Sequence, residues 1–92
     1  MAVGLILDYR GGTLEQYDRI SEMMPGAGAR VPPGAIFHWV AATDDGVRVV
    51  DVWEDRATFD KFDEEMLGPF TADVGAPAPE ITEYEVHKML AP

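Results

Sequence analysis

The centre of the chain carries the signature of a β-hairpin, and this feature constrains the fold more than any other. Residues 35–43 and 47–53 are both rich in β-branched and aromatic residues, and Asp44-Asp45-Gly46 separates them. An Asp-Gly dipeptide between two such runs is a strong signal for a tight turn between antiparallel strands. We therefore expect a hairpin near the middle of a chain of 92 residues.

A strand and a helix are predicted before this hairpin. Residues 2–10 form a short apolar run that is typical of a strand buried on both faces. Thr13 and Gln16 match the capping box, in which an N-cap hydroxyl and a side chain three residues later satisfy each other's backbone amides. The helix that follows should end at Pro25-Gly26, because proline and glycine interrupt helical hydrogen bonding.

A second helix and a last strand are predicted after the hairpin. Asp55 is placed to cap a helix over residues 56–67, and Pro69 should end or kink it. A further helical turn is expected near residues 70–74. Residues 80–90 have the alternating character of a strand.

The resulting order, β-α-β-β-α-β, predicts a ferredoxin-like α+β fold in one domain spanning residues 1–92. Right-handed crossovers interleave the two βαβ units into a four-stranded antiparallel sheet, in the order 4-1-3-2, with both helices on one face. The strands carry apolar residues at both odd and even positions, which point to opposite faces of the sheet, so the uncovered face should also be apolar. Such a face favours association, and we expect a homodimer packed sheet to sheet.

Composition excludes several classes of function. The chain has no cysteine, which excludes disulfides, thiolate nucleophiles and cysteine-ligated metals. Its formal net charge of -10 disfavours binding to nucleic acid or to anionic membranes. The apolar run at the start lacks a basic flank and is too short for a signal or membrane helix, so we expect a cytoplasmic protein.

The segment RVVDVWEDRATFDKF (48–62), together with the chain length and the order of elements, resembles the dimeric α+β barrel superfamily. Within it the chain is similar to the antibiotic biosynthesis monooxygenase-like group. The resemblance implies a homodimer and one of several activities. These include cofactor-independent oxygenation of polycyclic phenols, polyketide cyclisation, isomerisation and haem degradation.

Strand parity indicates a candidate catalytic pair. If the hairpin turn has two or four residues, His38 shares a face with Asp51 and Trp53, and also with Ile36 and the nearby valines. Phe37 and Trp39 then lie on the other face. A three-residue turn would reverse this assignment. A carboxylate beside an imidazole orients the ring and raises its basicity, so His38 and Asp51 could abstract a proton from a phenol or an acidic C–H group.

A pocket for a small apolar or aromatic ligand is predicted between the helices and the sheet. Trp53, Tyr17, Phe62 and Tyr9 are the expected aromatic walls, and the glycine- and proline-rich loop 26–34 is the expected edge. Core packing is the alternative role for each aromatic residue taken singly. His87, on the predicted last strand, is expected either at the rim of the sheet or near the partner's site.

The sequence carries no recognisable metal or cofactor motif, so we expect neither a metal nor a cofactor. The haem-degrading branch of the superfamily typically has a helix tryptophan and a helix histidine after the VWE strand. Phe62 matches the tryptophan position, and no histidine occurs between residues 55 and 86. This disfavours haem degradation, although His38 could ligate an iron. Two hypotheses stay open: a monooxygenase-like or cyclase-like enzyme, and a non-catalytic dimer with a ligand-binding or stress-related role.

Overall fold

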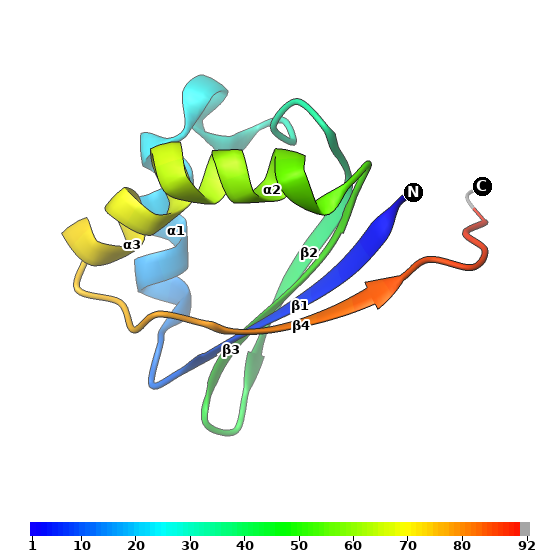
Figure 1. Cartoon of the computed structure of the whole chain (residues 1–92). Helices are drawn as coiled ribbons and strands as arrows, with labels where there is room; N and C mark the ends of the chain where they lie inside the picture. Colours follow the sequence, from blue (N-terminus) through cyan, green and yellow to red (C-terminus); the bar gives the residue numbers. More distant parts are fainter. Residues whose placement is uncertain (91–92) are drawn as a thin grey trace.

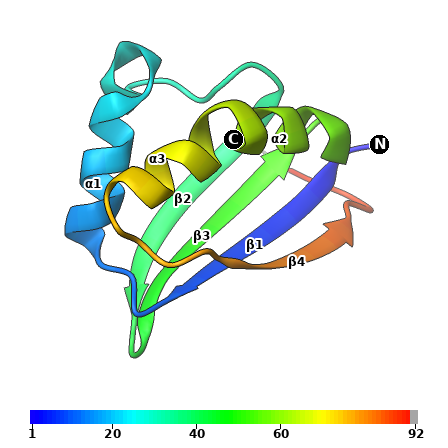
Figure 2. The ribbon, with the colours of Figure 1, turned by 60° about the vertical axis from the view of Figure 1, so that its left-hand side comes forward.

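The computed structural model describes residues 1–90, which form a four-stranded antiparallel sheet with helices on one face (Figures 1 and 2). The spatial order of the strands is β2-β3-β1-β4, as predicted from the sequence. The ferredoxin-like α+β fold is therefore confirmed. The strands are β1 (Val3–Arg10), β2 (Ala35–Thr43), β3 (Gly46–Trp53) and β4 (Glu80–Glu85).

The first helix, α1 (Leu14–Met23), begins with the predicted capping box. The Thr13 hydroxyl accepts a hydrogen bond from the backbone N–H of Gln16, and the Gln16 side chain accepts one from the backbone N–H of Thr13. A short 3₁₀ turn (Pro25–Gly28) follows the helix. No helix within residues 1–90 is long and apolar enough to cross a lipid bilayer.

The second helical region continues past Pro69, where an end or a kink had been predicted. Helix α2 (Arg56–Phe62) passes through a π-helical turn (Asp63–Leu67) into α3 (Gly68–Asp73). In the wide turn the backbone N–H of Gly68 bonds to the carbonyl of Asp63, five residues back. Pro69 then occupies the first turn of α3, where a missing N–H is tolerated.

The hairpin between β2 and β3 has a two-residue turn, which confirms the predicted parity. Thr43 pairs with Gly46 and His38 pairs with Asp51 across the two strands. The register shifts between Ala35 and Phe37, so that Ala35 lies opposite Trp53. Ala35 packs against the core while Ile36 is 46% exposed, so the prediction that Ile36 shares the face of His38 does not hold at this irregularity.

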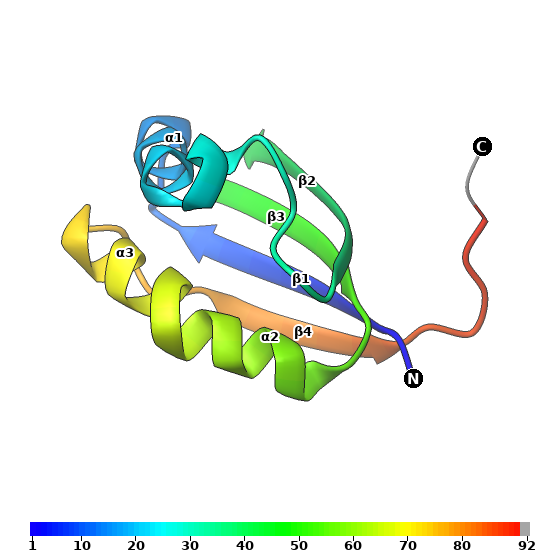
Figure 3. The ribbon, with the colours of Figure 1, turned by 90° about the horizontal axis from the view of Figure 1, so that it is seen from above.

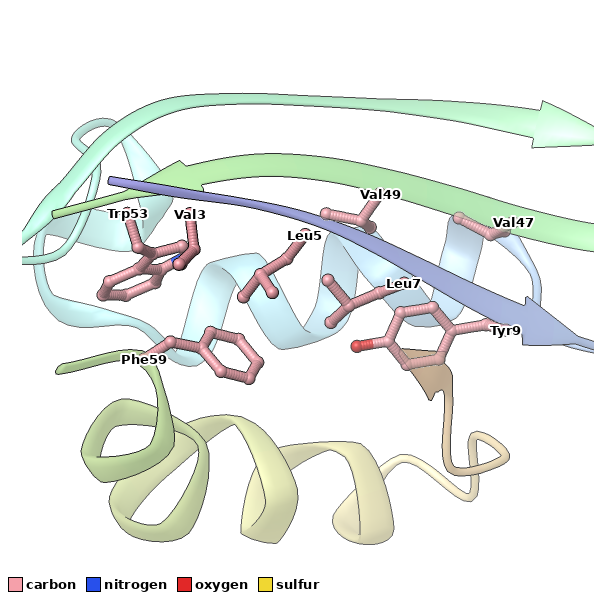
Figure 4. Close-up of a cluster of buried hydrophobic side chains, with 8 residues drawn as sticks. All are labelled: Val3, Leu5, Leu7, Tyr9, Val47, Val49, Trp53 and Phe59. Carbon is pink, nitrogen blue, oxygen red and sulfur yellow. The ribbon is translucent and has the colours of Figure 1, made fainter. Parts of the chain in front are cut away.

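The hydrophobic core lies between the sheet and α2. Alternate residues of β1 and β3 point to the helix-covered face, and Figure 4 shows Phe59 of α2 directed toward them. The Trp53 and Phe59 rings meet edge to face, with centroids 5.5 Å apart. The buried cluster comprises Val3, Leu5, Leu7, Tyr9, Val47, Val49, Trp53 and Phe59.

The last strand is shorter than predicted, because it ends at Glu85 rather than at residue 90. Its antiparallel partner β1 begins at Val3, which pairs with Glu85. One further backbone hydrogen bond joins Val86 to Ala2. The exposed His87 therefore lies outside the strand, one residue beyond the last backbone hydrogen bond to this side of the sheet.

The opposite face of the sheet has no helix from residues 1–90 packed on it (Figure 1). Phe37 and Trp39 of β2 are 52% and 44% exposed there, and Tyr84 of β4 is 60% exposed. The strand registers place these side chains in two rows across the sheet with Val50, Val52 and Ile6. These side chains form an apolar patch on this face.

Gly34 joins the loop 26–34 to β2 in a tight contact with α2. Its φ is +89°, and a Cβ atom there would lie 2.3 Å from Thr58 Cγ2. Gly75 also has a positive φ, of +72°, but a Cβ atom there would meet no atom within 4 Å. The two glycines thus share a left-handed backbone and differ in the space around them.

We predict that Gly34→Ala destabilises the protein more than Gly75→Ala does. Left-handed backbone costs an alanine about 1 kcal/mol at either position, and overpacking against Thr58 should add about 1–3 kcal/mol at Gly34 only. Urea unfolding of the two variants measures the difference. Equal losses of unfolding free energy would contradict the prediction, because they would show that α2 shifts to accommodate the added methyl group at no cost.

Candidate functional site

A cavity of about 830 Å³ lies between the helices and the sheet. Figure 3 shows α1 and the α2–α3 region lying apart over the sheet, with β1 and β3 visible between them. The walls of the cavity are mostly apolar, and its volume is in the range of small-molecule binding sites. The residues of the predicted site that line it are Tyr9, Tyr17, His38, Asp51, Trp53 and Phe62.

His38 and Asp51 form a direct hydrogen bond in the wall of this cavity. The distance between His38 Nδ1 and Asp51 Oδ1 is 2.6 Å. The two residues are cross-strand partners in the hairpin, so the register of β2 on β3 sets this contact. Both residues line the cavity, and the His38 side chain is 32% exposed while that of Asp51 is only 10% exposed.

Asp51 has a second hydrogen-bond donor in Trp53. The indole N–H of Trp53 donates to Asp51 Oδ2 at 3.2 Å. Burying a carboxylate is costly unless its oxygens are hydrogen-bonded, and here each oxygen has one partner. Trp53 itself is 1% exposed, so it serves both as core and as support for the carboxylate.

The other ring nitrogen of His38 is also hydrogen-bonded, to a residue of α1. The distance from His38 Nε2 to the Tyr17 hydroxyl is 2.6 Å, and the two rings are stacked with centroids 5.9 Å apart. Because a carboxylate oxygen only accepts, Asp51 fixes the proton on Nδ1 and leaves Nε2 as an acceptor. Tyr17 therefore donates to His38, and His38 donates to Asp51.

The sequence indicated Tyr17 only as an aromatic wall and did not indicate its bond to His38. Helical spacing in the sequence puts Tyr17 on one apolar face with Leu14, Ile20 and Met24. Ile20 is indeed buried, whereas Leu14 is 44% exposed. Which residue of α1 reaches β2 depends on how the helix lies over the sheet, and no local pattern specifies that.

Both tyrosines of the cavity are held in the neutral form. Burial raises the pKa of Tyr17, and the negative charges of Asp51 and Asp18 raise it further. Burial also raises the pKa of Tyr9 well above its ordinary range, with smaller contributions from Asp63 and Asp51. Each phenol thus keeps its proton at neutral pH and can act as a hydrogen-bond donor.

Aromatic rings form the end of the cavity near α2. The centroids of the Phe62 and Trp53 rings lie 5.3 Å apart, and the angle between the ring planes is 36°. Ala35 and Leu67 pack against the same cluster. A flat ligand would therefore meet an apolar aromatic wall beside the hydrogen-bonded residues.

The rim of the cavity is formed partly by the loop 26–34, as predicted. Its residues from Gly28 to Pro33 line the cavity, and the charged residues of the lining besides Asp51 are Arg30, Lys61 and Glu65. Gly28 lies against α1 so closely that a Cβ atom would be 1.9 Å from Ser21 Oγ. The loop is thus fixed to α1 at one end and, through Gly34, to α2 at the other.

His87 is not among the residues that line the cavity in the single chain. It follows the end of β4, at the sheet edge opposite β2. Within residues 1–90, no group of three histidine, aspartate or glutamate residues is arranged to hold a metal ion. The expectation that His87 approaches the partner's site stays a prediction.

Comparison with protein-family models and with curated proteins gives no match. Comparison with solved structures gives matches that include two proteins, each described as a "putative antibiotic biosynthesis monooxygenase". The protein from Chloroflexus aurantiacus J-10-fl superposes with a TM-score of 0.72 at 19% identity, over 99% of this chain and 98% of that one. The protein from Deinococcus radiodurans superposes with a TM-score of 0.57 at 11% identity, over 99% of this chain and 97% of that one.

The chain has the fold of these two proteins. The resemblance drawn from the sequence is thereby confirmed for the fold, over nearly the whole length of each chain. At these identities the likeness does not extend to an activity, which the site of this chain has to supply.

We predict that Tyr9 makes the protein sensitive to alkali. Above pH 10 the unfolded chain begins to lose the phenol proton, whereas the folded chain, with its raised pKa, retains it. The stability that is present below pH 10 is therefore lost as pH rises toward the folded pKa. Tyr9→Phe should remove this loss, by up to about 1.4 kcal/mol per pH unit.

Urea unfolding at pH 8, 10 and 11 tests this expectation. The wild type should lose stability relative to Tyr9→Phe as pH rises. Tyr84→Phe, on the opposite face of the sheet, keeps Tyr9 and is the control, so its stability should still fall as pH rises. Parallel curves for wild type and Tyr9→Phe would contradict the assignment.

Proposed function

We propose that the protein is a small cofactor-independent enzyme that removes a proton from an aromatic or polyketide-type substrate, in a monooxygenase-like or cyclase-like reaction. The observation that carries this proposal is the hydrogen-bonded series Tyr17–His38–Asp51 in the wall of an aromatic cavity. The names of the two proteins that share the fold point in the same direction.

The residues divide the work between chemistry and binding. His38 takes up the proton, and Asp51 orients the ring and stabilises the positive charge that it gains. Trp53 and Phe62 provide the flat apolar wall for the substrate ring. Removal of a proton from a phenol or an activated C–H group leaves a phenolate or enolate. That anion can attack a carbonyl of the same molecule or react with dissolved dioxygen.

Ligand binding without turnover is the second candidate function. It is favoured by one observation, that both nitrogens of His38 already have hydrogen-bond partners within the chain. A base whose nitrogens are both engaged is a structural element unless one partner moves or transmits the proton. Measurement of proton transfer separates the two functions.

We expect the protein to accelerate hydrogen–deuterium exchange at the acidic CH₂ of 2-tetralone, a bicyclic aromatic ketone used as the probe. Proton NMR in D₂O follows this exchange without requiring any later step. His38→Ala should lower the rate by roughly 10²–10⁴-fold, because the proton acceptor is lost. Asp51→Asn should lower the exchange rate less, because it removes the carboxylate charge that orients and stabilises the ring but keeps the imidazole.

Circular dichroism of each variant serves as the control for folding. Equal exchange rates for wild type and a folded His38→Ala would remove His38 from the mechanism. Saturable binding of 2-tetralone without any accelerated exchange would favour the ligand-binding function. Dioxygen uptake with the same probe would support a monooxygenase-like reaction.

A homodimer built on the apolar sheet face is part of the proposal. Phe37, Trp39 and Tyr84 are unusually exposed for large apolar side chains and lie in one patch with Val50 and Val52. Burying several hundred Å² of this patch at about 25 cal/mol per Å² is favourable by roughly 10 kcal/mol per chain before association costs. The Arg48–Asp8 ion pair on the same face would lie at the edge of the patch.

Sedimentation at micromolar concentration should therefore give twice the chain mass of 10.1 kDa. Trp39→Lys should give monomers, because a lysine in the centre of the interface would be buried without a partner. Leu90→Lys, at a position 81% exposed and outside the patch, is the control and should stay dimeric. A wild-type monomer at micromolar concentration would contradict the dimer.

A further inference from the structure

The Tyr17 hydroxyl occupies the position from which a substrate would have to reach His38. His38 Nδ1 is bonded to Asp51 and Nε2 to Tyr17, each at 2.6 Å, so neither ring nitrogen is free. Tyr17 also lines the cavity. Its oxygen uses its one proton toward His38 and retains lone pairs that can accept another hydrogen bond.

We infer that Tyr17 is the catalytic residue that meets the substrate proton, and that His38 receives a proton through it. This inference rests on the proposed function and changes the role of Tyr17 from a wall to a relay. His38 then acts through the phenol, held in place by Asp51.

Two protons move in this transfer. The substrate C–H or O–H bond breaks, and its electron pair stays on the substrate as an enolate or phenolate. The released proton goes to the Tyr17 oxygen while the original Tyr17 proton goes to His38 Nε2. The products are the substrate anion, a neutral Tyr17 and an imidazolium, and Asp51 remains a carboxylate throughout. No electron is gained or lost.

The electrostatics favour simultaneous movement of the two protons. Burial and the nearby carboxylates raise the pKa of Tyr17, so a free phenolate would be unfavourable at this position. In the simultaneous transfer Tyr17 is neutral before and after the step. The positive charge forms on His38, where the Asp51 carboxylate is in direct contact.

The ring geometry also suits this role. The Tyr17 and His38 rings are stacked, at an angle of 14° between their planes, and the short O–N distance aligns the phenol with the ring nitrogen. Tyr17 lies on a helix that begins with a complete capping box four residues earlier, so its position is anchored. A relay requires such fixed geometry, because proton transfer needs heavy atoms within hydrogen-bond distance.

Nitrogen-15 NMR of the ligand-free protein tests the ground state without reference to activity. Loss of the phenol donor in Tyr17→Phe should move the Nε2 resonance of His38 downfield, while Nδ1 stays protonated. Tyr84→Phe removes a hydroxyl from the opposite face of the sheet, where it does not contact His38, and should leave both resonances in place. An unchanged Nε2 resonance in Tyr17→Phe would overturn the relay.

The 2-tetralone exchange assay then tests the transfer itself. Tyr17→Phe keeps the aromatic wall, so KM should stay within about threefold while kcat falls by roughly 10²–10⁴-fold, as for loss of a general base. The double variant Tyr17→Phe/His38→Ala should be no slower than either single variant, because the two residues act as one unit. A purely structural Tyr17 would change KM or stability and leave kcat near that of the wild type.

The outcomes separate the two proposals. If His38→Ala is inactive and Tyr17→Phe keeps the wild-type kcat, His38 meets the substrate directly, so the relay is wrong and the proposed function stands. If neither single substitution lowers kcat, both fail. Absence of exchange with the wild type would also overturn both.

Discussion

The burial of the Asp51 carboxylate on the central strand β3 is the constraint on which the rest of the site depends. Asp51 is 7% exposed and lies between Leu5 of β1 and His38 of β2. A carboxylate in that position is tolerated because Trp53 donates to one oxygen and His38 to the other. This requirement fixes the tautomer of His38, and the tautomer in turn makes Nε2 an acceptor for Tyr17. The orientation of four side chains from three elements thus follows from one buried charge.

The same strand alternation gives the two faces of the sheet different uses. Successive side chains of β2 and β3 point to opposite faces, so His38 and Asp51 face the helices while Trp39 and Val50 face outward. The helix-covered face is not fully packed, and the unfilled volume is the cavity beside His38. The outward face is apolar without a cover from residues 1–90. We therefore propose that ligand chemistry belongs to the first face and chain association to the second.

The sequence was sufficient to predict what depends on local periodicity. Strand alternation placed His38 beside Asp51 on the condition of a two- or four-residue turn, which the structure has, and the Thr13 capping box placed the start of α1. Features set by the packing of distant elements were beyond such reasoning. The bond from Tyr17 to His38 depends on the path of α1 over β2, and the end of β4 at Glu85 depends on where β1 begins. A π-helical turn precedes Pro69, where an end or a kink was predicted, and Pro69 then lies in the first turn of α3, where the missing N–H is tolerated.

The central claim is that Asp51 holds the His38 proton on Nδ1, and a proton NMR spectrum of the wild type measures this most directly. A hydrogen bond of 2.6 Å between the imidazole and a buried carboxylate should give a strongly deshielded Nδ1–H resonance that exchanges slowly with water. That resonance should disappear in Asp51→Ala and persist in Tyr17→Phe. A wild-type spectrum in which His38 carries its proton on Nε2, with Nδ1 unprotonated, would contradict the account.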